Sequence, residues 1–288
     1  VRRRLGRMAG LIVASDALVA WCSGLIDQGY RGEMECIIAK IFGSEAQKEV
    51  AIEYFMKTHG GRSFLQGHMF GDNVHEYLAP CIYEGEGEML GMAFFKSLVK
   101  QHGRRFFEPI GMALQAAGIR NPNLLNPSHA WALRKPLWDY SKWFIAREAH
   151  GGGGHVSLPP MPRELRAHAE FGAHFLQRSA LEITATLRKH QLKLADRQCR
   201  MAELSQRIQW ATVILCTSLY GSRQEDDLIR TAADCVCDDL TAKLMGHRPS
   251  DRYLRKVTGL GAAIAEGKFS ALRDVESEAI LMSYPVNG

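Results

Sequence analysis

The chain has 288 residues, of which 46% are hydrophobic and 23% are charged, and its formal net charge is +5. This composition excludes a disordered chain and supplies enough apolar residues for one large or two medium domains. The small positive charge permits an anionic partner, but the sequence has no long basic stripe, so we expect no nucleic acid.

Helical periodicity dominates the first hundred residues. Apolar residues recur at helical spacing over 5–25, and this helix is expected to end at Gly29. A second helix is expected to end at Gly60–Gly61, because glycine is the usual residue just beyond a helix C-terminus. A third is expected over about 88–100. No run of eighteen apolar residues occurs, so we expect no helix to cross a bilayer.

The segment 103–162 is expected to be irregular, because it holds seven of the ten prolines and ends in HGGGGHVSLPPMP. From Arg163 the helical period returns, and no convincing strand alternation occurs anywhere. The sequence therefore predicts an all-α fold with two helical bundles, residues 1–98 and 163–288, joined by a Pro/Gly-rich connector, 99–162.

Seven cysteines occur without a CxxC pair, which is typical of reduced thiols. Cys235 and Cys237 have no second pair, so we interpret them as small core or groove-lining residues and expect no metal ion. The segment GLGAAI (259–264) lacks the third glycine and the preceding strand of a dinucleotide-binding loop.

The acidic segment CIYEGEGEML (81–90) has two interpretations. Glu84, Glu86 and Glu88 fit solvated acids at the start of a helix, where negative charge is favoured by the helix dipole. Alternatively, Glu84 is a general base that lies behind the apolar run. Taken by itself, the segment favours the first interpretation.

The segments MKTHGGRSF and CIYEGEGEML, about two dozen residues apart, change this balance. In that order and spacing they resemble the double-glycine turn and the IYEG(T/S) segment in the C-terminal helical domain of acyl-CoA dehydrogenases. The helix GEMECIIAKIFGSEAQKEVA is also similar to a helix of that family. Residues 163–288 resemble, more loosely, the extra helical domain of the very-long-chain branch.

The resemblance implies FAD-dependent oxidation of a long-chain acyl-CoA to the trans-2-enoyl-CoA in fatty-acid β-oxidation. The family's catalytic base corresponds to Glu84, and its backbone N–H would donate to the thioester carbonyl. We expect Ile82 and Tyr83 on one side, and a bound acyl chain on the other, to exclude water from Glu84 and so raise its carboxyl pKa toward the working pH. Tyr83 and Gly85 are expected beside the substrate.

The resemblance also implies cofactor contacts. Gly60 and Gly61 would approach the ADP part of FAD. Lys57 stands where the family has Gln, and Glu86 stands where it has Thr or Ser, so both are expected at the cofactor. The Arg-Asp pair that precedes the motif in the family is replaced by His75-Glu76.

These departures keep alternatives open. One is a catalytically silent scaffold or assembly relative that lost the flavin, a second is an acyl-CoA oxidase, and a third is a helical membrane-binding module. The chain is expected to be a C-terminal fragment that lacks the N-terminal helical domain, the β-barrel domain and the first helix of its own domain. By itself the fragment is expected to be inactive.

Residues 126–144 (NPSHAWALRKPLWDYSKWF) mix tryptophans with cations. Such a mixture suits a membrane surface, and it suits equally well aromatic packing between two helical blocks. The resemblance further implies an electron-transfer flavoprotein as partner and a homodimer or dimer of dimers. The expected location is the bacterial cytoplasm or the mitochondrial matrix, with peripheral attachment to the inner membrane.

Overall fold

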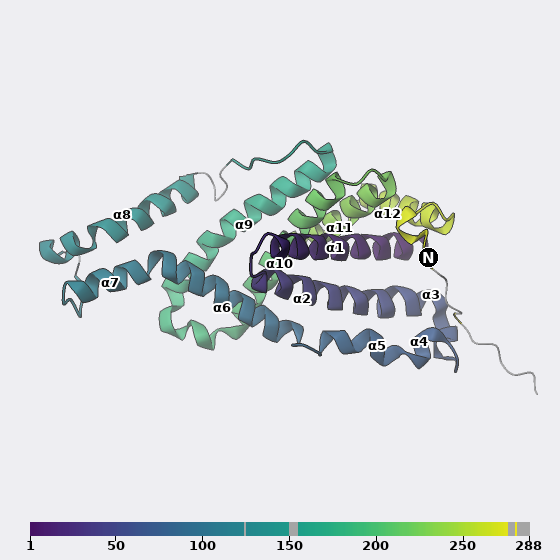
Figure 1. Ribbon diagram of the computed structural model, residues 1–288, viewed down its shortest axis with the longest axis horizontal. Coiled ribbons are helices and arrows are strands. Elements are labelled where there is room, and N and C mark those ends of the chain that lie inside the picture. The colour runs from purple at the N-terminus through teal and green to yellow at the C-terminus, as the bar shows by residue number, and fades with distance from the viewer. Residues whose placement is uncertain (124, 150–154, 276–279, 281–288) are drawn as a thin grey trace, which may run out of the picture. The chain divides into compact units, whose positions relative to one another are not determined.

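The computed structural model describes residues 1–123, 125–149, 155–275 and 280 (Figure 1). The described residues form helices and turns and contain no strand, which confirms the predicted all-α fold. The main helices that begin in the first hundred positions are α1 (Arg2–Asp27), α2 (Glu33–Glu49), α5 (Val74–Leu78) and α6 (Gly87–Phe106). A π-helical segment (Val50–Met56) directly follows α2. The later helices are α7 (Glu108–Ala116), α8 (Pro127–Ala149), α9 (Arg163–His190), α10 (Gln198–Ser222), α11 (Asp227–Met245) and α12 (Asp251–Ala265).

Further short α-helices and 3-10 turns complete the described chain. They are α3 (Lys57–His59), α4 (Met69–Asp72) and the 3-10 turns Gly60–Phe64, Ala79–Cys81, Gln191–Asp196 and Ser270–Leu272.

The chain divides into two compact units whose boundaries differ from the predicted ones. The first unit comprises residues 1–91, 158–172 and 209–288, and the second comprises 92–157 and 173–208. Residues 163–288 therefore do not form a unit of their own. The reason is that α9 and α10 are long, and each of them contributes one part to each unit.

In the first unit, α1 and α2 form a helical hairpin, and α1 also packs along α11 and α12 (Figure 1). The α1 face toward these helices is built from small residues. A Cβ added at Gly6 would lie 2.2 Å from the carbonyl oxygen of Val257, and one at Gly10 would lie 3.0 Å from Cβ of Val236. The helices approach so closely only because these positions lack side chains.

We expect Gly6→Ala to lower the free energy of unfolding by about 1–3 kcal/mol, because the new methyl group must displace the backbone of α12. Gly24→Ala on the same helix is the matched control, since no atom lies within 4 Å of a Cβ there. The control should raise stability by up to about 1 kcal/mol through helix propensity. Urea unfolding followed by circular dichroism measures both, and equal effects would contradict the close packing.

By length and composition alone, α1 could cross a membrane, which corrects the expectation that no helix meets that test. A helix of this kind is weak evidence for a span, because core helices pass the same test. In this chain Val13, Ala14 and Leu18 of α1 are buried against other elements of the first unit. The burial agrees with the role of a core helix.

The predicted end of the second helix is confirmed, with one difference. Gly60 follows the last helical turn with φ +62°, a left-handed conformation that glycine adopts without strain. Between α2 and this end, Val50–Met56 form a π-helical segment that the periodicity did not indicate. Such segments are rare and occur often near functional sites.

Much of the segment 99–162 is helical, so the prediction of an irregular connector is wrong for α7 and α8. Two of its prolines lie where a helix tolerates them. Pro109 is the second residue of α7, and Pro127 is the first residue of α8. Pro136 lies inside α8, where the sequence indicated a break. The four glycines at 151–154 lie outside the described residues.

An aromatic cluster lies in the second unit. Phe106 of α6 packs on Trp143 of α8 with ring centroids 4.5 Å apart, and His102 lies 5.4 Å from the same indole ring. The Nε2 atom of His102 is also 2.6 Å from the hydroxyl of the buried Thr184 on α9. These contacts make Trp143 part of the packing within this unit.

Candidate functional site

The IYEG segment lies between the 3-10 turn Ala79–Cys81 and the start of α6, and two contacts hold it against α2. Lys40 of α2 donates from Nζ to the carbonyl oxygen of Gly85. Cys81 donates from Sγ to the carbonyl oxygen of Ser44 at 3.3 Å. The loop that carries Glu84 is therefore fixed at both ends to a helix of the first unit.

Glu84 has an unusual backbone conformation. Its φ is +57°, and among the described residues it is the one residue other than glycine with positive φ. The next residue, Gly85, has φ +106°, and a Cβ there would lie 2.8 Å from the Leu90 side chain. A non-glycine residue held in this region is uncommon and costs free energy, and such residues cluster at functional sites.

The polar groups of Glu84 are available for a ligand. Its side chain is exposed and makes no hydrogen bond or ion pair within the described part of the chain. Its backbone N–H likewise meets no acceptor there. Ile82 is 66% and Tyr83 is 68% exposed, so without a bound acyl chain these two side chains do not shield Glu84 from water.

Glu86 caps the start of α6. Its carboxylate accepts the backbone N–H of Glu88 at 2.9 Å and that of Met89 at 3.1 Å. The bond from Glu88 is the main reason that the pKa of the Glu86 carboxyl lies below its ordinary value. Glu88 itself lies in the first turn of α6. These two acids thus take the place of helix-start residues, and Glu84 does not.

The double-glycine turn is built by contacts from outside it. Arg4 of α1 donates to the carbonyl oxygen of Lys57 at 2.7 Å, and Ser63 donates to the carbonyl oxygen of Met56 at 2.9 Å. Gly60 and Gly61 are exposed, and a Cβ at either position would meet no atom within 4 Å. The turn therefore presents open backbone, as a close approach by a ligand requires.

The backbone of the double-glycine turn is available for the expected FAD contacts, whereas the side chains expected there are engaged elsewhere. Gly60 and Gly61 leave room for a phosphate group at the turn. Lys57 is already paired with Glu53 one helical turn before it, and the carboxylate of Glu86 is used as a cap. The residues present thus fit FAD through Gly60 and Gly61, whereas Lys57 and Glu86 have other partners.

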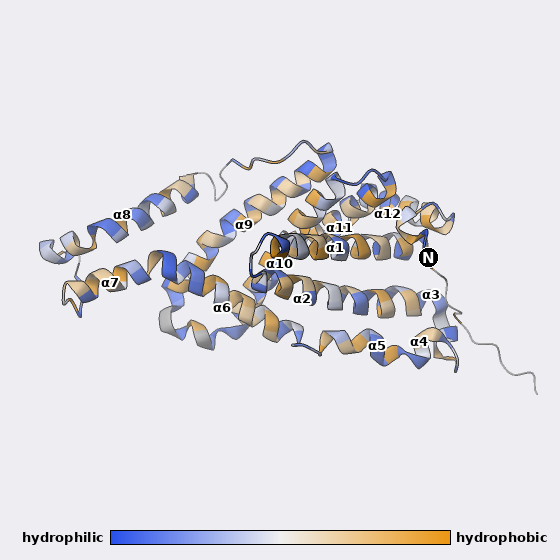
Figure 2. Ribbon diagram, viewed as in Figure 1, coloured by the Kyte–Doolittle hydropathy of each residue, from blue (hydrophilic) through white to orange (hydrophobic). Residues whose placement is uncertain are grey.

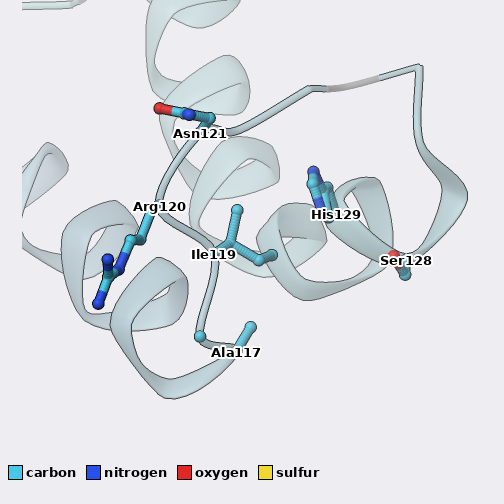
Figure 3. Close-up of a pocket in the computed structure, with 7 residues that line it drawn as sticks. Ala117, Ile119, Arg120, Asn121, Ser128 and His129 are labelled. Atoms are coloured by element: carbon cyan, nitrogen blue, oxygen red, sulfur yellow. The ribbon is translucent and has the colours of Figure 1, made fainter.

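A cavity of about 370 Å³ lies in the second unit, between the end of α7 and the start of α8 (Figure 3). Its lining is Ala117, Gly118, Ile119, Arg120, Asn121, Ser128 and His129. Arg120 extends away from His129 in Figure 3, so the two basic groups do not converge on a common point. None of the predicted site residues lines this cavity.

The sequence reasoning missed a charged cluster in the first unit. His168 of α9 lies 2.9 Å from Asp234 and 3.6 Å from Asp238 of α11. Lys256 of α12 donates to both carboxylates, at 2.6 Å to Asp238. The histidine and the two acids are close enough to share a metal ion, but the ammonium group already supplies the positive charge between the carboxylates.

Residues 1–98 match a family model, that of the acyl-CoA dehydrogenase C-terminal domain. The match ends within α6, and it includes the double-glycine turn and the IYEG segment. A search of the curated proteins found no match to the chain.

Proposed function

Because residues 1–98 match the family model of the acyl-CoA dehydrogenase C-terminal domain, we propose that this protein oxidises long-chain acyl-CoA to trans-2-enoyl-CoA with FAD. The conformation of Glu84 is the observation that carries the proposal. Glu84 has a left-handed backbone conformation, and its loop is fixed to α2. Its carboxylate oxygens and its backbone N–H are all available to bind a ligand.

In the proposed reaction the carboxylate of Glu84 takes the α-proton of the thioester. The backbone N–H of the same residue donates to the thioester carbonyl and stabilises the negative charge that develops on its oxygen. FAD, when bound, accepts the hydride from the β-carbon. Gly85 lets the chain turn beside the thioester. The side chain of Tyr83, which precedes Glu84, is exposed and available for contact with the substrate.

Ile82 and Tyr83 are exposed here, so they do not shield Glu84 from water by themselves. In the proposal, the bound acyl chain and the family's other domains exclude water from Glu84. Those domains would also form most of the flavin pocket. The chain by itself would therefore bind FAD poorly and be inactive. The proposal includes a homodimer or dimer of dimers and an electron-transfer flavoprotein as electron acceptor.

The test uses the protein together with those other domains, and its FAD-loaded form is mixed anaerobically with palmitoyl-CoA. The flavin absorbance should bleach, and enoyl-CoA should form in an equal amount. A protein that retains no flavin would be the silent scaffold relative, and peroxide production in air would identify an oxidase. Either result contradicts the proposal.

A second proposed role is attachment to a membrane surface through α8. Trp131 and Trp138 are 68% and 60% exposed, and Ile145 is 62% exposed. These residues lie seven positions apart, so they share one face of the helix. Hydrophobic and hydrophilic residues alternate along α8 in Figure 2.

Cations accompany both exposed rings. The guanidinium of Arg134 lies 3.8 Å from the ring centroid of Trp131, and the ammonium of Lys142 lies 5.2 Å from that of Trp138. Indole rings next to cations match the chemistry of an anionic lipid headgroup region. Trp143 is excluded from this surface, because it belongs to the aromatic cluster of the second unit.

Replacing Trp131 and Trp138 together with Ser should weaken binding to anionic vesicles at least about tenfold, because each ring buried in the interface stabilises it by about 1.5–3 kcal/mol. Vesicle flotation measures the change, and circular dichroism checks that the helices remain. Tyr30→Ser, which removes an aromatic ring that is 63% exposed between α1 and α2, is the control. Flotation of the double variant like the parent would show that α8 does not dock.

A further inference from the structure

Two histidines lie next to the double-glycine turn, and their contacts assign the position of each ring proton. His68 is completely buried, and its Nδ1 accepts the backbone N–H of Phe70 at 3.1 Å. An imidazole nitrogen that accepts a hydrogen bond carries no proton, so the ring proton of His68 lies on Nε2.

The same argument extends to His59. The Nε2 atom of His68 lies 3.4 Å from Nδ1 of His59, and only His68 has a proton to donate there. His59 therefore accepts at Nδ1 and carries its own proton on Nε2. The ring of Phe55 lies 4.5 Å from that of His59 and restricts its orientation.

His59 directly precedes Gly60, and its Nε2 has no partner among the residues that the structure describes. Burial, with smaller contributions from His68 and Arg62, lowers the pKa of His59, which keeps the ring neutral at pH 7. The carbonyl of Lys57, which would repel an anion, is already bound by Arg4. The turn thus combines open backbone, an oriented N–H donor and nearby positive charge.

We propose that His59 is a binding residue of this turn, whose Nε2–H donates to a phosphate oxygen of an adenosine diphosphate group. His68 acts through it as a positioning residue that sets its tautomer. The inference deepens the proposed function and rests on it for the class of ligand. Adenosine diphosphate is the part that FAD and coenzyme A have in common, so the chemistry alone does not separate them.

The first experiment uses the full chain with ADP as the probe and imidazole ¹⁵N NMR as the readout. Without ADP, His59 should show the Nε2–H tautomer, and millimolar ADP should shift its Nε2 signal. His59→Phe keeps the ring contact with Phe55 but removes the donor, and it should weaken ADP binding about tenfold, the effect of one hydrogen bond to a charged acceptor. His247→Phe, at an exposed histidine just beyond α11, should bind like the parent.

His68→Asn tests the positioning role separately. Asparagine can still accept the N–H of Phe70 but is too short to reach His59, so His59 should become a mixture of tautomers and ADP binding should weaken several-fold. The fold is checked by circular dichroism. An unshifted His59 signal with ADP, or ADP binding by His59→Phe at the parent's affinity, would overturn the inference.

The second experiment titrates the flavin-free chain and compares the dissociation constants of FAD and coenzyme A for the parent and His59→Phe. A weaker FAD complex assigns the turn to the cofactor, and a weaker coenzyme A complex assigns it to the substrate. No change in either overturns the inference. These are binding measurements, so failure of substrate to bleach the flavin would contradict the dehydrogenase proposal and leave this one standing.

Discussion

Glu84→Gln in the FAD-loaded protein should reduce the rate of flavin bleaching by acyl-CoA about 10²–10⁴-fold, the usual contribution of a positioned general base. The amide has almost the shape of the carboxylate but cannot take a proton. The backbone N–H is unchanged, so the thioester should still bind and polarise. Flavin content and acyl-CoA affinity should therefore stay near the parent values, while anaerobic stopped-flow absorbance records the loss of rate.

Glu88→Gln is the matched control for this experiment. It makes the same change four residues later, in the first turn of α6, where the carboxylate has no role in the proposed reaction. Its bleaching rate should be that of the parent. Bleaching of Glu84→Gln at a comparable rate would show that another group removes the α-proton, even if the protein is a dehydrogenase.

The sequence identified the segment around Glu84 but not its geometry. The pattern IYEG and its distance from Gly60–Gly61 were sufficient to indicate the domain, and the family match covers both. The positive φ of Glu84 could not be predicted, because most residues avoid that region and nothing in the pattern marks an exception. The exposure of Ile82 depends on which neighbours are present, which local sequence does not contain.

The sequence predicted the helix ends marked by glycine, but it did not predict the helices that begin at or next to a proline. Gly29 and Gly60 both take positive φ just beyond a helix, as the sequence indicated. Pro109 and Pro127 were interpreted as breaks, although proline at the first turn of a helix loses no hydrogen bond. Composition alone does not distinguish these two positions of proline.

The charged cluster could not be predicted for a different reason. His168 lies 66 positions before Asp234, and Lys256 lies 22 positions after it, so three helices must come together before the side chains meet. The pattern of residues along one helix does not show which side chains of other helices it will meet. Asp234 and Lys256 are 13% and 19% exposed, which places a largely buried ion pair in the first unit.

Burial disfavours the charged forms of Asp234 and Lys256, but the hydrogen bonds and opposite charges of their partners favour these forms more strongly. Burial by itself would raise the pKa of Asp234, but the hydrogen bonds from His168 and Lys256 lower it below its ordinary value. Burial would lower the pKa of Lys256, but Asp234 and Asp238 raise it. Asp234 therefore adds stability that is lost as the pH falls below about 3.9, and Lys256 adds stability that is lost as the pH rises above about 10.4.

Lys256→Met should lower the free energy of unfolding at pH 7 by about 3–5 kcal/mol, because it leaves the carboxylates without their cation in a mostly buried site. In the variant, burial should raise the pKa of Asp234. The loss should then shrink as the pH falls, since protonation removes the uncompensated charge. Urea unfolding at pH 7 and pH 4 measures this, with Lys268→Met as the control, because its pair with Glu266 is exposed and should add little. A loss that is equal at both pH values would indicate that Lys256 contributes by the packing of its methylene groups and not by its charge.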